Sequence, residues 1–193
     1  MKRVCVYCGS SPGARPEYAV AARELGRVLA ANGLGLVYGG STTGLMGNVA
    51  DGALDAGGEV IGVIPRMFVS KGIDHLGLSE TRIVNSMHER KAVMAELGDA
   101  FIALPGGMGT LEEVFEILTW AQLGLHSKPC GFLSIRGYYS GLAEFLDYSV
   151  SQRFIKEEHR TMILMAETPE ALLGKFREYE APVIDKWIDR KGS

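Results

Sequence analysis

The feature that most restricts the fold of this chain is a regular succession of short apolar runs and segments of helical periodicity. These strand-like runs and helical patterns follow one another at 2–8, 16–33, 34–40, 43–58, 59–65, 80–85, 86–98, 99–105, 109–124, 128–135 and 137–154. Strands that are separated by helices in this way pair in parallel through right-handed crossovers. The sequence therefore predicts an α/β fold, a parallel sheet with helices on both faces.

The length and composition of the chain predict a single domain. It has 193 residues, of which 47% are hydrophobic, and this is enough for one sizeable core. A helical pattern at 169–180 is the last regular feature. We expect one domain over 1–180 and a C-terminal tail over 181–193.

The charge balance argues against a nucleic-acid partner. Lys and Arg number 20 against 23 Asp and Glu, a formal net charge of −3, whereas proteins that bind a polyphosphate backbone concentrate basic residues. Only five apolar residues lie between Arg3 and Gly9, too few for the core of a signal peptide, and no later run is long enough to span a bilayer. We therefore expect a cytoplasmic protein with no nucleic-acid partner and no membrane contact.

The three cysteines predict free thiols. Cys5 and Cys8 form a C-x-x-C within a predicted strand, where residues three apart point to opposite faces. Such a pair cannot easily form a disulfide. Cys130 has no cysteine near it in the sequence, and the four histidines show no ligand spacing, so we expect no metal site.

Unusual residues, mainly glycines and hydroxyl residues, gather in four segments that follow predicted strands, at 8–13, 38–47, 64–68 and 104–110. The carboxyl ends of parallel strands meet at one edge of the sheet, where open α/β sheets bind their ligands. Glycines there bring backbone N–H groups close to an anion, and the following helix adds the positive end of its dipole. Each loop alone could be a tight turn, but four at one edge favour a nucleotide phosphate. The candidate contacts in the first two loops are Ser10, Gly39, Gly40 and Gly44.

The fourth loop opens a helix in the sequence PGGMGTLEE. The chain has neither the G-x-x-x-x-G-K-[ST] of Walker NTPases nor the G-x-G-x-x-G of dinucleotide-binding folds. The N–H groups from Gly106 to Thr110 can hold an anion, and Glu113 is expected in the first turn, where a carboxylate is electrostatically favoured. Capping explains one glutamate, but Glu112 and Glu113 together would repel a bound anion. The pair therefore indicates chemistry beside the phosphate.

The MHERK motif places an arginine on the apolar side of a predicted helix. Arg90 lies at i+3 from Met87 and at i−4 from Met94, so it shares their predicted inner face. An arginine in that position needs a carboxylate or a phosphate as partner. Glu89 and Lys91 are expected on a solvated face.

Together these segments resemble the LOG family, phosphoribohydrolases that cleave cytokinin nucleotides. The resemblance depends on PGGxGTxxE, here PGGMGTLEE, with MHERK upstream, and YGGSTTGLMG, CGSSPG and TWAQLG extend it over 1–154. It implies a Rossmann-like, doubly wound homodimer whose nucleotide-binding catalytic domain hydrolyses the N-glycosidic bond of AMP, or of an N6-modified AMP. The products would be the free base and ribose 5-phosphate, and no cofactor or metal is implied.

The resemblance also implies roles for individual residues, with catalysis on Arg90 and Glu113. The implied substrate contacts, with Gly106 added from the loop argument, are Lys91, Gly106, Gly107, Met108, Gly109, Thr110, Leu111, Glu112 and Thr119. One position departs from the family pattern, because the segment after IPR has Gly72 where a glutamate is usual. That contact is either lost or supplied by a neighbour such as Asp74, on a segment that glycine could make a mobile lid.

A mechanism follows from the chemistry of the bond. Cleavage between ribose and purine builds positive charge on the sugar, as in other reactions with oxocarbenium-like transition states. The Glu113 carboxylate would stabilise that charge and could orient or deprotonate the attacking water. Arg90 would either bind the phosphate or hold Glu113 ionised and aimed, and the pattern leaves both roles open.

Three functions compete at this point. The phosphoribohydrolase is favoured because it gives Arg90 and Glu113 a task. A non-catalytic nucleotide-binding carrier or sensor would need the phosphate loops but not Glu113, and an NAD-dependent oxidoreductase lacks its fingerprint glycines. The predicted helix at 112–124 is apolar on more than one face, which fits a homodimer interface or burial under later helices.

Overall fold

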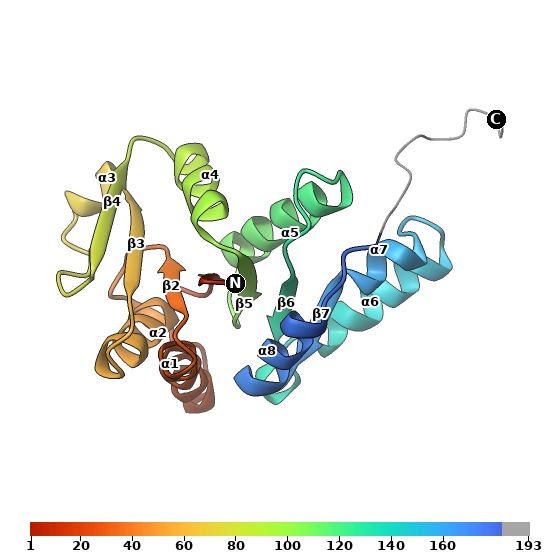
Figure 1. Cartoon of the computed structure of the whole chain (residues 1–193), viewed down its shortest axis with the longest axis horizontal. Helices are drawn as coiled ribbons and strands as arrows, with labels where there is room; N and C mark the ends of the chain where they lie inside the picture. The colour runs from red at the N-terminus through yellow and green to blue at the C-terminus, as the bar shows by residue number, and fades with distance from the viewer. Residues whose placement is uncertain (183–193) are drawn as a thin grey trace.

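Seven strands form one sheet in the order β4-β3-β2-β1-β5-β6-β7 (Figure 1). The strands are β1 (Arg3–Tyr7), β2 (Gly35–Tyr38), β3 (Val60–Pro65), β4 (Glu80–Val84), β5 (Ala100–Ala103), β6 (Cys130–Leu133) and β7 (Ile163–Ala166). The structure, a computed structural model, describes residues 1–182, so the predicted tail lies outside the described residues from 183 onward. Every pairing between the strands is parallel, which confirms the predicted α/β class.

β1 is the strand at which the direction of winding reverses. It pairs with β2 on one side, where Arg3 lies opposite Gly35, and with β5 on the other, where Tyr7 lies opposite Ala103. The chain builds outward from β1 to β4 and then returns to the other side of β1 as β5. The loops that follow β1 and β5 therefore diverge, and the crevice between them is the usual ligand position in such sheets.

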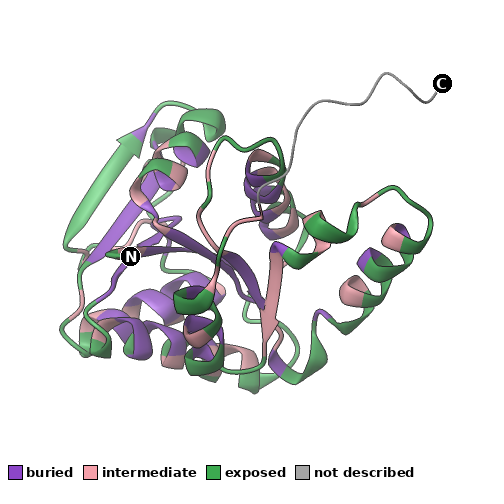
Figure 2. Ribbon diagram, turned by 45° about the vertical axis from the view of Figure 1, so that its right-hand side comes forward, coloured by how far each residue is buried: buried purple, intermediate pink, exposed green. Residues whose placement is uncertain are grey.

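Helices cover both faces of the sheet. They are α1 (Pro16–Ala31), α2 (Gly44–Asp55), α3 (Arg66–Val69), α4 (Met87–Leu97), α5 (Met108–Gln122), η1 (Ile135–Gly137), α6 (Ser140–Ser151), α7 (Glu157–Thr161) and α8 (Pro169–Glu178). α1, α2 and α8 pack on one face, and α4 and α5 pack on the other. Figure 2 shows buried strands between these layers, and α6 and α7 lie at the β7 end of the molecule (Figure 1).

The first helix shows how local sequence specifies an element. Pro16 occupies the first position of α1, where the missing N–H costs nothing, and Gly33 follows the helix with φ of 68°. α1 then packs against α2 so closely that a Cβ on Gly26 would lie 2.1 Å from the carbonyl oxygen of Val49. Only glycine permits this close approach of the two helices.

The two faces of the sheet carry separate apolar clusters. Leu36 and Tyr38 pack under α1 and α2, whereas Val37 between them packs under α4 and α5, as expected for a strand buried on both faces. Cys8 lies in the first cluster and Cys5 in the second, and both thiols are free, which confirms their predicted opposite orientation. Each fully buried aliphatic side chain contributes about 1.5–3 kcal/mol to folding.

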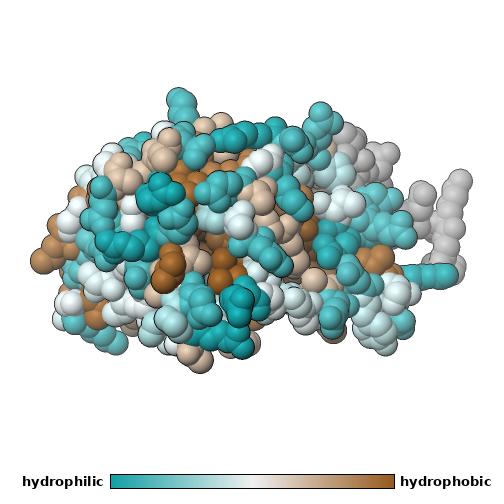
Figure 3. Space-filling view, turned by 90° about the horizontal axis from the view of Figure 1, so that it is seen from below, coloured by the Kyte–Doolittle hydropathy of each residue, from teal (hydrophilic) through white to brown (hydrophobic). Residues whose placement is uncertain are grey.

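The sequence patterns missed four elements, namely α3, η1, α7 and β7. α3 and α7 have four and five residues, too few to show a helical period. β7 has four half-buried residues without alternation. Within the described part of the chain, no helix is both long and apolar enough to cross a bilayer. The surface over α1, α2 and α8 is mainly hydrophilic with smaller apolar areas (Figure 3).

Candidate functional site

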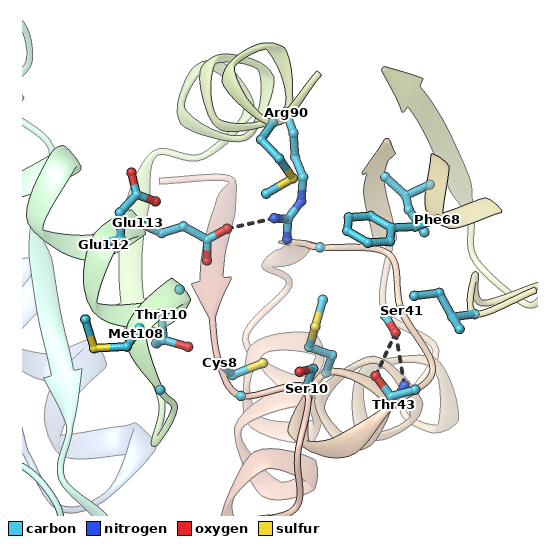
Figure 4. A pocket seen from close by; sticks show the side chains of 18 residues that line it. Cys8, Ser10, Ser41, Thr43, Phe68, Arg90, Met108, Thr110, Glu112 and Glu113 are labelled. Atoms are coloured by element: carbon cyan, nitrogen blue, oxygen red, sulfur yellow. Dashed lines mark hydrogen bonds and ion pairs between the residues drawn. The ribbon is translucent and has the colours of Figure 1, made fainter. Parts of the chain in front are cut away.

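A cavity of about 520 Å³ lies where β1, β2, β3 and β5 end (Figure 4). It occupies the point at which the sheet reverses its winding, as predicted for the four loops that follow these strands. Pockets for small ligands and cofactors fall in this size range. The cavity therefore has both the position and the volume expected for a nucleotide.

Backbone hydrogen bonds join the glycine-containing loops into one wall. The Gly9 N–H donates to the Pro105 carbonyl and the Leu45 N–H donates to the Gly9 carbonyl, each at 3.0 Å. Gly44 has φ of 58°, and a Cβ there would lie 2.3 Å from the carbonyl carbon of Ser10. Only glycine fits between these two loops, so Gly44 supports the wall from behind.

The start of α5 presents unpaired N–H groups to the cavity. The helix begins at Met108 with Gly107 as an extended N-cap, and the first four N–H groups of a helix have no acceptor within it. Thr110 also lines the cavity, and a Cβ on Gly106 would lie 2.1 Å from its hydroxyl oxygen. These donors and the positive end of the helix dipole form a site for an anion.

The loop after β2 adds two hydroxyl groups. Ser41 Oγ lies 2.9 Å from Thr43 Oγ1 and accepts a hydrogen bond from the Thr43 N–H at 3.2 Å. Both residues line the cavity, on the side away from Thr110 (Figure 4). The glycine and hydroxyl content of 38–47 located this loop, but the candidate residues chosen from it did not include this pair.

Arg90 and Glu113 form a buried charge pair across the cavity. Arg90 Nη1 donates to Glu113 Oε1 at 2.8 Å, and Arg90 Nε donates to the Val63 carbonyl at 3.1 Å. Their side chains are only 11% and 10% exposed. A Cβ on Gly39 would lie 2.1 Å from Arg90 Nη2, so the glycine makes room for the guanidinium. Of the two roles left open for Arg90, holding Glu113 is the one that this geometry matches.

Glu113 lies in the second turn of α5, and not in the first as predicted, because the helix begins at Met108. Its carboxylate is therefore beyond the capping position. Burial raises the pKa of Glu113, and the Arg90 guanidinium opposes that shift. The Glu112 charge raises the pKa of Glu113 further, although the Glu112 side chain points away from Arg90 (Figure 4). A carboxylate with a raised pKa and a fixed orientation suits proton transfer or charge stabilisation.

The prediction that Lys91 lies on a solvated face is wrong, and the structure gives no support to its implied contact with the substrate. Lys91 is buried, with 8% of its surface exposed, and not solvated. Its ammonium group binds the Glu112 carboxylate and lies 3.1 Å from Glu116 Oε2, and the bond to Glu112 raises the pKa of Lys91. Lys91 does not line the cavity, so it contacts the carboxylate behind the site. Glu89 is exposed as predicted and accepts a hydrogen bond from the Asn85 N–H.

An apolar wall faces the anion site. Phe68 and Ile73, from the segment after β3, and Met87, at the start of α4, line this side of the cavity. Met87 is 39% exposed. The prediction that it lies on the buried inner face of its helix is therefore wrong. The segment is tied to the loop after β2, because the Thr42 N–H donates to the Ile73 carbonyl and the His75 N–H donates to the Gly40 carbonyl, each at 3.0 Å.

Gly72 has a backbone reason to be glycine. It follows α3 with φ of 66°, a conformation that side chains other than glycine rarely adopt, and no atom lies within 4 Å of a Cβ placed there. Asp74 pairs with Ser41 as an isolated bridge. A glutamate at position 72 would be strained, which gives a backbone reason for this departure from the family pattern.

The structure brings most of the predicted site residues together. Those that line the cavity are Ser10, Gly39, Arg90, Gly107, Met108, Gly109, Thr110, Glu112 and Glu113. Those that do not line it are Gly40, Gly44, Lys91, Gly106, Leu111 and Thr119. Thr119 lies farther along α5, where its hydroxyl donates to the Phe115 carbonyl at 2.7 Å. Among the residues that the structure describes, no group of three or more His, Cys, Asp and Glu could hold a metal ion.

Comparison with known families and proteins identifies relatives of this chain. A family model described as "Possible lysine decarboxylase" matches residues 46–176. A probable cytokinin riboside 5'-monophosphate phosphoribohydrolase of Oryza sativa subsp. japonica is 51% identical over 178 residues, which are 92% of this chain and 78% of that protein. A cytokinin riboside 5'-monophosphate phosphoribohydrolase of Arabidopsis thaliana is 47% identical over 178 residues, 92% of this chain and 83% of that protein.

Solved structures share the fold at lower identity. The molybdenum cofactor binding protein of Rippkaea orientalis has a TM-score of 0.69 and 22% identity, over 92% of this chain and 97% of that one. The molybdenum cofactor carrier protein of Chlamydomonas reinhardtii has a TM-score of 0.69 and 21% identity, over 92% and 96%. These two show the Rossmann-like fold alone. The family model, which covers more than half of the chain, and the two plant relatives show that the chain belongs to the LOG family.

Proposed function

We propose that this chain hydrolyses the N-glycosidic bond of adenosine 5'-monophosphate, or of its N6-modified forms, to the free base and ribose 5-phosphate. The observation that carries the proposal is a buried carboxylate, Glu113, held by Arg90 at 2.8 Å beside the anion site of α5. The rice and Arabidopsis relatives are named as cytokinin riboside 5'-monophosphate phosphoribohydrolases, which supports the cytokinin-activating reaction.

The two sides of the cavity bind different parts of the substrate. The 5'-phosphate binds the N–H groups at the start of α5 and the hydroxyl groups of Ser10 and Thr110, all of which line the cavity. The base lies against the apolar wall that includes Phe68 and Ile73. The ribose is then held between them, beside Glu113.

The reaction uses the carboxylate at the carbon that loses the base. As the bond to the purine breaks, positive charge grows on the ribose, and the Glu113 carboxylate stabilises it and takes a proton from the attacking water. Arg90 keeps that carboxylate ionised and aimed through the bond at 2.8 Å. The water attacks the sugar carbon, the base leaves with the bonding electron pair, and a proton returns to the base. This chemistry needs no metal or cofactor.

Incubation with AMP and with N6-isopentenyl AMP, followed by chromatographic separation of the products, tests the activity. We expect free base and ribose 5-phosphate from the unmodified protein. Glu113→Gln should lower kcat by a factor on the order of 10² to 10³ or more, because it removes a charge that acts in the transition state. Glu178→Gln, at an exposed glutamate of α8 away from the cavity and from the proposed dimer interface, is the matched control and should leave kcat unchanged. Full activity of Glu113→Gln would refute the mechanism.

The alternative is a non-catalytic nucleotide carrier or sensor on the same fold. This alternative is retained because the solved structures that share the fold include a molybdenum cofactor binding protein and a molybdenum cofactor carrier protein. Nucleotide that binds but stays intact after long incubation would favour this alternative. An oxidoreductase has no such support, and a lack of NAD binding would remove it.

A homodimer is part of the proposal, with the surface formed by α5 and α6 as its interface. Large apolar side chains are exposed there and just beyond each helix, at Leu123, Leu125, Phe145, Tyr148 and Phe154. Exposed apolar patches of this kind mark interaction sites. Light scattering at micromolar concentration should give twice the mass of 20.9 kDa, and the monomer mass would refute the dimer. A cytoplasmic location stays a prediction, and the three free thiols fit it.

A further inference from the structure

Two adjacent tyrosines hold the loop that precedes α5. The Tyr138 hydroxyl donates to the Gly106 carbonyl and the Tyr139 hydroxyl donates to the Leu104 carbonyl, each at 2.7 Å. Both tyrosines follow η1, where Arg136 has the unusual φ of 54°. Neither tyrosine lines the cavity, so both contact the loop from outside.

The bond from Tyr138 sets the direction of one particular peptide group. The described residues contain no cis peptide, and in a trans peptide the C=O and the next N–H point in opposite directions. Because the Gly106 carbonyl points outward to Tyr138, the Gly107 N–H points the other way, toward the side on which Gly107 lines the cavity. The same bond also polarises the peptide and makes its N–H a stronger donor.

This peptide needs such a restraint because it joins two glycines. Gly106 and Gly107 have no side chains that would oppose a rotation of the peptide between them, and a Cβ on Gly107 would have no atom within 4 Å. In the rotated form, the Gly106 carbonyl oxygen would face the cavity and repel an anion. The Tyr138 hydroxyl favours the form that binds.

Tyr138 is itself held in place by other aromatic rings. Its ring lies edge-on to Tyr18 at 5.6 Å and to Tyr139 at 4.9 Å between centroids. Tyr18 in turn fills the space beside Gly13, where a Cβ would lie 2.8 Å from the ring. This row of rings therefore links the loop after β1 to the loop before α5, two of the loops that line the cavity.

We propose that Tyr138 is a positioning residue for phosphate recognition, which acts through the Gly106 carbonyl to aim the Gly107 N–H at the 5'-phosphate of the substrate. The proposal rests on the proposed function for the identity of that anion. It assigns no contact between Tyr138 and the substrate.

Tyr138→Phe tests the proposal, because it removes the hydroxyl and keeps the ring between Tyr18 and Tyr139. The loss of one such hydrogen bond should raise KM for AMP about 3- to 10-fold, with kcat unchanged within about twofold. The kcat/KM for adenosine, which has no phosphate, should not change. Tyr179→Phe, at a half-buried tyrosine just after α8 and outside both the cavity and the proposed dimer interface, is the matched control and should leave both substrates unaffected.

Two further measurements separate this role from a general structural one. Tyr139→Phe leaves the buried Leu104 carbonyl without its donor, so it should lower the melting temperature without a loss that is selective for AMP. Calorimetric titration with ribose 5-phosphate should show the same 3- to 10-fold weakening in Tyr138→Phe, even if the protein hydrolyses nothing. That titration keeps a failure of the proposed function distinct from a failure of this inference. Equal losses for AMP and adenosine, or unchanged ribose 5-phosphate affinity, would overturn the proposal.

Discussion

Replacement of Arg90 by methionine should destabilise the protein in a way that depends on pH. The Arg90 and Glu113 side chains are 11% and 10% exposed and are joined at 2.8 Å. Removal of one partner of a buried ion pair leaves an uncompensated charge and costs about 3–5 kcal/mol. Glu113 can avoid this cost by taking up a proton, so the penalty depends on how readily the solution supplies one.

The direction in which stability changes with pH follows from the pKa of Glu113. Burial raises this pKa above its ordinary value of 4.5, Arg90 opposes the shift, and loss of Arg90 raises the pKa further. The folded protein then binds the proton more tightly than the unfolded chain, so the free energy of unfolding falls as pH rises through this window. The variant should be close to wild type near about pH 5 and should lose about 3–5 kcal/mol at about pH 8.

Urea denaturation followed by circular dichroism would measure this effect in the wild type, Arg90→Met, Glu113→Gln and the double variant. The double variant has no charge left at this pair, so it should recover most of the stability that Arg90→Met loses at the higher pH. A residual loss of about 1 kcal/mol is expected, because the Val63 carbonyl also loses its bond from Arg90. The reasoning fails if Arg90→Met is equally destabilised at both pH values and the two substitutions are additive.

Three further predictions concern the reaction. Gly39→Ala should lower kcat about 10²-fold without loss of the fold, because its Cβ would lie 2.1 Å from Arg90 Nη2 and displace the guanidinium; an unchanged kcat would show that Arg90 can move without consequence. The pH profile of kcat should fall on the acid side with a midpoint above 4.5, since burial raises the pKa of Glu113 and only its ionised form is active; a midpoint at or below 4.5 would speak against this. Adenosine should have a kcat/KM lower than that of AMP by about 10² or more, because the phosphate-binding energy positions the ribose, and equal values would mean that the glycine loops are only turns.

Much of the fold could be predicted from the sequence because its signals are local. Five of the seven strands, β1, β2, β3, β5 and β6, have apolar runs with glycine or proline beside them, and β1 to β6 all lie where the pattern places them. The glycine loops could be assigned to one edge of the sheet, because parallel strands bring all their carboxyl ends together. β7 escaped prediction, since four half-buried residues at the edge of the sheet have no period to detect.

The sequence by itself determined the chemistry available at this site, through PGGMGTLEE, MHERK and the glycine loops, because motif residues and turn chemistry are encoded within a few positions of one another. Only the tertiary structure decided which partners those residues find. Arg90 meets Glu113 across 23 positions, while its neighbour Lys91 is drawn into the Glu112 and Glu116 carboxylates and away from the cavity. The physical reason is that a helical period predicts on which face of its helix a residue lies, but it does not predict which element packs against that face. The strand order places α4 and α5 on the same face of the sheet on either side of β1, and that arrangement sets which charges become buried together.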